Sequence, residues 1–109
     1  MDALLNEDDL QEIVIDLTAQ LNESELMLMG AKIKWMLGAM FGDSPISATV
    51  RGTSRQVRSF GKALSGEKKY MDAYTRYGLN DARTYKSKVK LNYSIKNFER
   101  ATGLKWPIG

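Results

Sequence analysis

The fold is organised around residues 24–41, SELMLMGAKIKWMLGAMF, which are apolar on nearly every face of a helix. A helix of this kind has to be surrounded by other parts of the protein. Asn22 is suited to cap its start, with Glu25 three residues later as its partner in a capping box. Gly42 follows the last apolar residue as a C′ glycine, and Pro45 stops the helix from continuing. The sequence therefore predicts one central, buried helix.

This central helix approaches the length of a membrane span but carries Glu25, Lys32 and Lys34. The two lysines lie about 200° apart around the helix axis, so one of them would face lipid near the middle of a bilayer. In a buried helix, by contrast, the lysine stems cover apolar surface while the ammonium groups reach water. We therefore expect a core helix and no membrane partner.

The whole chain has the composition of one globular domain, with 109 residues, 43% of them hydrophobic and 27% charged. It contains no cysteine and no histidine, which excludes disulfides, Cys/His zinc sites, thiol nucleophiles and imidazole bases. No cofactor and no metal site is predicted. Residues 1–7 carry no basic side chain, so we expect no secretory signal and a cytoplasmic location, in the host if the chain is viral.

Charge is distributed unevenly along the chain. Residues 1–50 carry two basic and nine acidic side chains, a balance of −7, whereas residues 51–109 carry fourteen basic and four acidic ones, a balance of +10. Such asymmetry favours a nucleic acid or another polyanion as the partner of the second half. The alternative is that the two halves neutralise each other within one fold.

A first helix is predicted before the central one, over residues 7–21, with Asn6 as its cap. Its apolar stripe consists of Leu10, Ile13, Val14, Leu17 and Leu21. The stripe should pack on the central helix and make residues 1–45 an acidic helical hairpin, which is followed by a basic helical half over residues 46–109.

A strand is predicted between the two halves, because residues 46–52, ISATVRG, alternate apolar and polar side chains. A lone strand leaves backbone groups without partners. It therefore serves as an extended connector, pairs with a weak second strand in a small ribbon, or pairs with a second chain in a homodimer. We favour the connector or the small ribbon.

A long helix is predicted after Gly52, starting at a capping box of Thr53 and Gln56 and ending at Gly78 with Leu79 as the hydrophobic cap residue. Ser65 and Gly66 predict a break within it. Its buried side is expected to carry Val57, Phe60, Leu64, Met71 and Tyr74.

The end of the chain is predicted to form one more helix. Residues 80–85 are interpreted as a loop or short turn, and the last helix runs over residues 88–102 with Gly103 and Leu104 as its C-terminal cap. Trp106 is expected to fold back onto the core. The buried side of this helix carries Leu91, Ile95 and Phe98.

The second half also contains a series of short motifs, namely VRGT at 50–53, QV at 56–57, Phe60, Leu64, EKKYM at 67–71, YGL at 77–79, FER at 98–100 and TGLKWP at 102–107. With these residues it resembles small uncharacterised proteins of tailed, T4-like bacteriophages. Because they are cap and core positions, the resemblance implies a shared fold and a viral origin, but no function and no catalytic residue. The acidic first part of the chain is not covered.

The sequence thus predicts a mainly α fold, a small single domain of four or five helices with one short extended segment. Its function is predicted to be non-enzymatic binding of nucleic acid, largely without sequence specificity, by basic helix faces interleaved with Tyr70, Tyr77, Tyr85 and Tyr93. The alternative is a protein-interaction, virion-assembly or host-modulating protein that binds an acidic protein partner. The candidate phosphate contacts are Arg55, Arg58, Lys62, Lys69, Arg76, Lys86, Lys90, Lys96 and Arg100.

Overall fold

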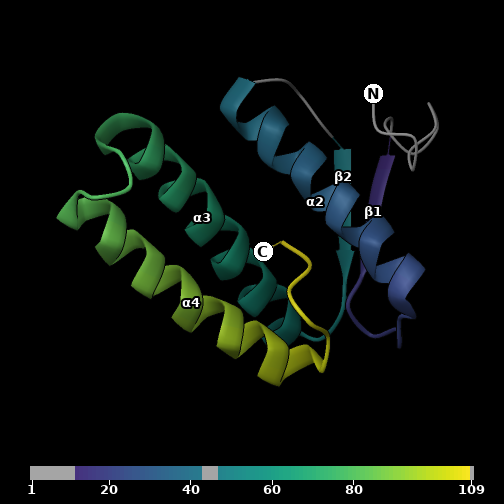
Figure 1. Ribbon diagram of the computed structural model, residues 1–109. Coiled ribbons are helices and arrows are strands. Elements are labelled where there is room, and N and C mark those ends of the chain that lie inside the picture. Colours follow the sequence, from purple (N-terminus) through teal and green to yellow (C-terminus); the bar gives the residue numbers. More distant parts are fainter. Residues whose placement is uncertain (1–11, 43–46, 109) are drawn as a thin grey trace.

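The computed structural model describes residues 12–42 and 47–108 of the chain. Its elements are, in order, β1 (Glu12–Asp16), α2 (Glu23–Gly42), β2 (Ser47–Arg51), α3 (Ser54–Tyr77) and α4 (Ala82–Thr102). The fold is mainly helical, as predicted, but the prediction of four or five helices is wrong: the described residues form three helices and a two-stranded sheet. Figure 1 shows α3 and α4 as an antiparallel hairpin beside α2 and the sheet.

Strand β1 lies where a helix over residues 7–21 was predicted. Residues 13–15, Ile-Val-Ile, are all β-branched and favour a strand. Ile13, Ile15 and Leu17 are buried, which is the period of two that a strand produces. The prediction of an acidic helical hairpin is therefore wrong for the residues that the structure describes, because the half-buried strand β1 replaces the first helix of that hairpin.

Some predicted features fall outside the described residues. They are the helix cap Asn6, the stripe residue Leu10, the stop at Pro45 and the first residue of the predicted strand, Ile46.

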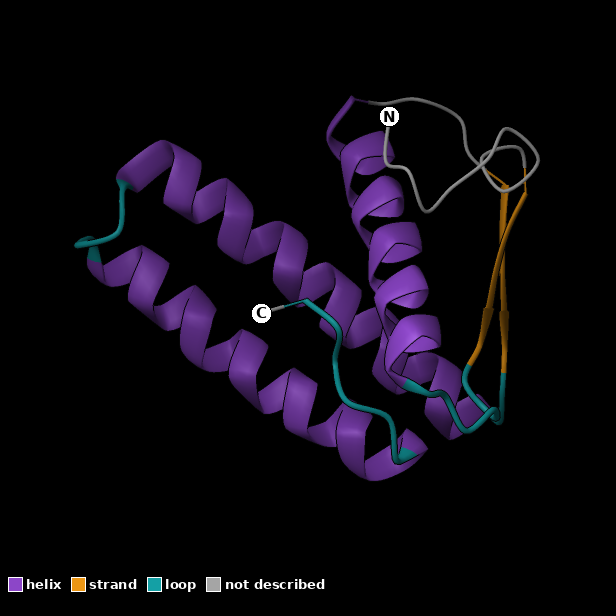
Figure 2. Ribbon diagram, turned by 45° about the vertical axis from the view of Figure 1, so that its right-hand side comes forward, coloured by secondary structure: helices purple, strands orange, loops and turns teal. Residues whose placement is uncertain are grey.

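The strand predicted over residues 46–52 is confirmed as β2, and the small ribbon is the alternative that the structure takes. β2 pairs with β1 in parallel, from Glu12 opposite Ser47 to Asp16 opposite Arg51. Figure 2 shows the two strands lying side by side at the edge of the molecule. Parallel neighbours need a crossover connection, and α2 supplies it.

Helix α2 begins as predicted. The Glu25 N–H donates to Asn22 Oδ1 at 2.8 Å, and the Asn22 N–H donates to Glu25 Oε1 at 3.3 Å. The expectation that the helix is surrounded on all sides is wrong, since Trp35 and Phe41 are 41% and 46% exposed. Gly42 is the last residue of the helix rather than a residue beyond it. In the described part of the chain, no helix is long and apolar enough to cross a membrane.

Helix α3 runs without the break predicted at Ser65 and Gly66. A Cβ added at Gly66 would lie 3.2 Å from Leu91 Cδ1, so this glycine lets α4 approach closely instead of ending the helix. The Thr53 and Gln56 capping box is confirmed.

The turn between α3 and α4 is shorter than predicted. Asp81 caps α4 by accepting from the Arg83 N–H at 2.8 Å, so residues 82–85 are helical and not a loop. Gly78 ends α3 as predicted, with a φ of 82°. Leu79 is 64% exposed and therefore does not pack as the predicted cap residue.

The core lies where the sheet, α2 and the start of the α3–α4 hairpin meet. Trp106 folds back onto it as predicted, with its ring centroid 6.1 Å from Phe60 and 5.0 Å from Phe98. Met71 and Tyr74 were predicted on the buried side of α3 but are 40% and 51% exposed. They lie near the end of α3, shortly before the turn to α4.

Candidate nucleic-acid interface

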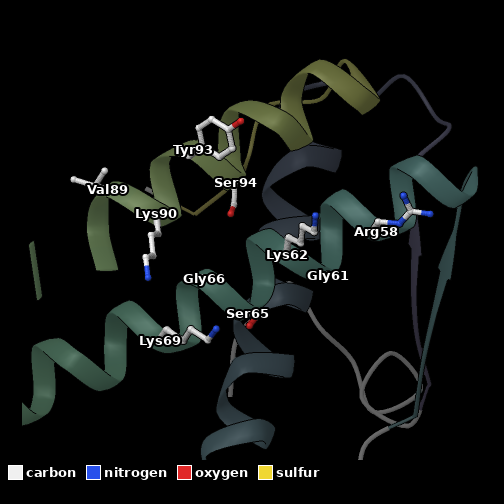
Figure 3. A pocket seen from close by; sticks show the side chains of 10 residues that line it. All are labelled: Arg58, Gly61, Lys62, Ser65, Gly66, Lys69, Val89, Lys90, Tyr93 and Ser94. Atoms are coloured by element: carbon white, nitrogen blue, oxygen red, sulfur yellow. The ribbon is translucent and has the colours of Figure 1, made fainter. Parts of the chain in front are cut away.

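A groove of about 800 Å³ lies between α3 and α4 (Figure 3). Both helices contribute to its walls, with Arg58, Gly61, Lys62, Ser65, Gly66 and Lys69 from α3 and Val89, Lys90, Tyr93 and Ser94 from α4. The volume lies within the range of pockets that hold small ligands. The groove is therefore large enough for part of an extended ligand.

Small residues leave the space that this groove occupies. On α3, Gly61 and Ser65 lie one turn apart, and Ser94 faces them from α4. A Cβ added at Gly61 would meet no atom within 4 Å. The close contact between Gly66 and Leu91 holds the two helices together while these small side chains leave a hollow between them.

Cations surround the hollow. Arg58, Lys62 and Lys69 follow one another at helical spacing along α3, and Lys90 extends from α4 toward α3 in Figure 3. No acidic residue of the described ranges lines it. The groove therefore presents positive charge from both helices to a ligand.

A second hollow, of about 190 Å³, continues the groove toward the start of α3. It shares Arg58, Lys62 and Ser94 with the first, and it adds Arg55. We call the two hollows together the basic groove. The other residues that line the second hollow are Ser59, Asn97 and Ala101.

The nine predicted phosphate contacts divide into two groups. Five of them line the basic groove, namely Arg55, Arg58, Lys62, Lys69 and Lys90. The other four are exposed but line neither hollow, namely Arg76, Lys86, Lys96 and Arg100. Of these, Lys86 lies one turn before Lys90 on α4.

Within the described residues, no acidic side chain forms an ion pair with a cation of the basic groove. Among the residues that the structure describes, the ion pairs join Arg76 to Asp72 at 3.3 Å and Arg83 to Asp81 at 3.0 Å, and neither pair includes a groove residue. Hydrogen bonds from Arg83 lower the pKa of Asp81, but this carboxylate lies at the start of α4 and outside the groove.

The four predicted tyrosines also differ in their surroundings. Tyr70 lies under the Lys88 ammonium at 4.8 Å, and Tyr77 lies under the Arg83 guanidinium at 3.5 Å. Tyr93 lines the groove and is 70% exposed, while Tyr85, two turns before it on α4, is 71% exposed. Of the four tyrosines, Tyr85 and Tyr93 on α4 therefore have the rings that are most exposed to a ligand.

Sequence reasoning missed the small residues that make the groove. Gly61 lies between Arg58 and Lys62, and Ser65 lies between Lys62 and Lys69, so the sequence contains a signal for small residues among the cations of this α3 face. Over residues 12–42 and 47–108, no three acidic side chains converge in a way that could hold a metal ion. Comparisons of the chain with protein-family models, with curated proteins and with solved structures find no match, so a function is inferred from the groove alone.

Proposed function

We propose that the protein binds nucleic acid through the basic groove, largely without sequence specificity and without catalysis. One observation carries the proposal: five cations from two helices surround one groove, and no acidic residue of the described part of the chain lines it. Phosphate groups are the anions that such an arrangement suits, because each neutralised phosphate releases counterions and thereby favours binding. We propose the cytoplasm as the place where this occurs.

The shape of the site supports binding without sequence specificity. The cations lie along the two walls of a hollow, where Lys and Arg side chains reach phosphate oxygens. Reading of bases in the major groove of DNA needs a helix or ribbon that projects into that groove. A hollow between two packed helices offers no such projection, so backbone contacts dominate.

Binding should depend strongly on salt. If the five groove cations each neutralise one phosphate, we expect affinity to fall roughly 100- to 500-fold between about 50 and 200 mM salt. Fluorescence anisotropy of labelled oligonucleotides measures this slope. Absence of binding at the lower salt concentration would contradict the proposal and favour an acidic protein as the partner of the same cations.

A further inference from the structure

We infer that the basic groove takes a single strand of nucleic acid, whose bases stack on Tyr85 and Tyr93; this inference rests on the proposed function. The two rings are 71% and 70% exposed, and Val89 between them is 50% exposed. The three residues follow at intervals of four along α4 and so share one side of it. They form an apolar stripe that borders the groove.

These two tyrosines have no other role within the described residues. No aromatic pair and no cation–π contact of that part of the chain includes either of them. An aromatic side chain that is exposed to water in this way contributes little to the stability of the fold. Such a side chain is suited to stack on the flat face of another ring. Lys86 follows Tyr85 directly, and Lys90 lies three residues before Tyr93.

The spacing of the tyrosines favours a single strand over a duplex. Eight residues of α-helix separate Tyr85 from Tyr93 by about 12 Å along the axis, whereas stacked bases are about 3.4 Å apart. A duplex hides the faces of its bases in its own stack, so it can offer only phosphates to the groove. A single strand can separate its bases, place one on each tyrosine and seat another in the hollow above Gly61.

Anisotropy titrations with an oligothymidylate of about 20 nucleotides and with a duplex of equal length test this inference. Replacing Tyr85 and Tyr93 by Ala should weaken single-strand binding roughly 5- to 100-fold per tyrosine, because each substitution removes one stacking platform. Binding of the duplex should change by less than about twofold. Tyr93→Phe keeps the ring and should retain the affinity.

Tyr74→Ala is the matched control, since Tyr74 is 51% exposed but lies on α3 and does not line the groove. The single-strand inference would be overturned if the Tyr85 and Tyr93 variants lost equal affinity for both probes, or lost none. Salt-dependent binding of the unaltered protein would still support the proposed function. Failure of both probes to bind the unaltered protein would overturn both.

A different observation supports a second inference: we infer that two copies of the chain form a dimer in which their β2 strands pair antiparallel, with Thr49 of one copy opposite Thr49 of the other. The pairing uses the edge of β2 that faces away from β1, which we call its outer edge. Within the described residues the sheet has two strands, so this edge is unpaired. Four of the five residues of β2 are exposed, so no other element that the structure describes covers this strand. A two-stranded sheet of this kind is only marginally stable alone.

The direction of the backbone groups fits this pairing. The Arg51 carbonyl accepts from the Leu17 N–H at 2.8 Å, so Arg51 directs its backbone groups toward β1. Because backbone direction alternates along a strand, Ala48 and Val50 direct their N–H and C=O groups outward. About a twofold axis at Thr49, Ala48 of one copy lies opposite Val50 of the other, and both exchange hydrogen bonds.

The side chains permit the same register. Thr49 lies opposite its own copy, a pair that antiparallel sheets favour, and Arg51 lies opposite Ser47, so no like charges meet. Edge strands that avoid pairing usually carry Lys, Pro or a bulge. β2 contains no Lys and no Pro, its register with β1 is regular, and its one charged residue, Arg51, stands at its end.

The oligomeric state in solution tests this inference, measured by sedimentation equilibrium over a range of concentrations. Ala48→Pro removes an outward N–H on each copy and should raise the dimer dissociation constant roughly 5- to 100-fold. Ala48→Ser keeps the N–H at the same exposed position and should leave the dimer unchanged. A monomeric wild-type protein, or an Ala48→Pro variant that dimerises equally well, would overturn the inference.

Discussion

Reversing both Arg58 and Lys62 to Glu is expected to reduce nucleic-acid affinity by a factor on the order of 10² to 10⁴, because hydrogen bonds to charged groups contribute about 1.5–3 kcal/mol each. Both side chains line the two hollows of the basic groove, so they occupy its centre. Both are exposed, and the fold should therefore persist. Anisotropy at low salt measures the loss, and circular dichroism checks that the helices remain.

The matched control reverses Arg76 on α3 and Lys96 on α4, which line neither hollow. It changes the net charge by the same amount. A loss confined to the Arg58 and Lys62 variant would place the phosphates in the groove. An equal loss in both variants would show that only the overall positive field attracts the ligand, and the site would then be wrongly assigned.

Local features of the fold could be predicted from the sequence because their causes lie within a few residues. The Asn22 cap, the Thr53 capping box and the end of α3 at Gly78 depend on hydrogen bonds between near neighbours. Residues 12–16 could not be assigned in this way. Ile13 and Leu17 fit a helical stripe and a strand equally, and pairing with the distant β2 decides for the strand.

The candidate site was predictable in its charges but not in its shape. Helical spacing alone places Arg58, Lys62 and Lys69 on one side of α3, and in the structure they line one groove. The hollow needs the position of α4, which the sequence does not reveal. Gly66 illustrates the difference: its low helix propensity predicts a break, whereas its contact with Leu91 makes it a packing position.

Replacing Trp106 by Ala is expected to lower the free energy of unfolding by about 3–5 kcal/mol, as large-to-small changes in cores do. Trp106 is 7% exposed and packs against Phe60 and Phe98, so it connects the C-terminal tail to both α3 and α4. The total free energy of unfolding of a domain is only about 5–15 kcal/mol, so this substitution would remove much of the stability. Urea unfolding followed by circular dichroism measures the change.

The other tryptophan is the matched control for this prediction. Trp35 is 41% exposed on α2, so Trp35→Ala should cost about 1 kcal/mol or less. If the two variants were equally stable, Trp106 would not be the anchor of the core that its contacts indicate.

A milder change separates the packing of Trp106 from its hydrogen bond. Trp106 Nε1 donates to Glu67 Oε1 at 2.8 Å, and Glu67 is itself buried. Trp106→Phe keeps a ring beside Phe98 but leaves this carboxyl group without its donor, which should cost about 1–3 kcal/mol. Adding Glu67→Met removes the stranded polar group and should restore part of the stability. If the second substitution destabilised the protein further, the carboxyl group would have partners other than Trp106, and the cost of Trp106→Phe would lie in packing.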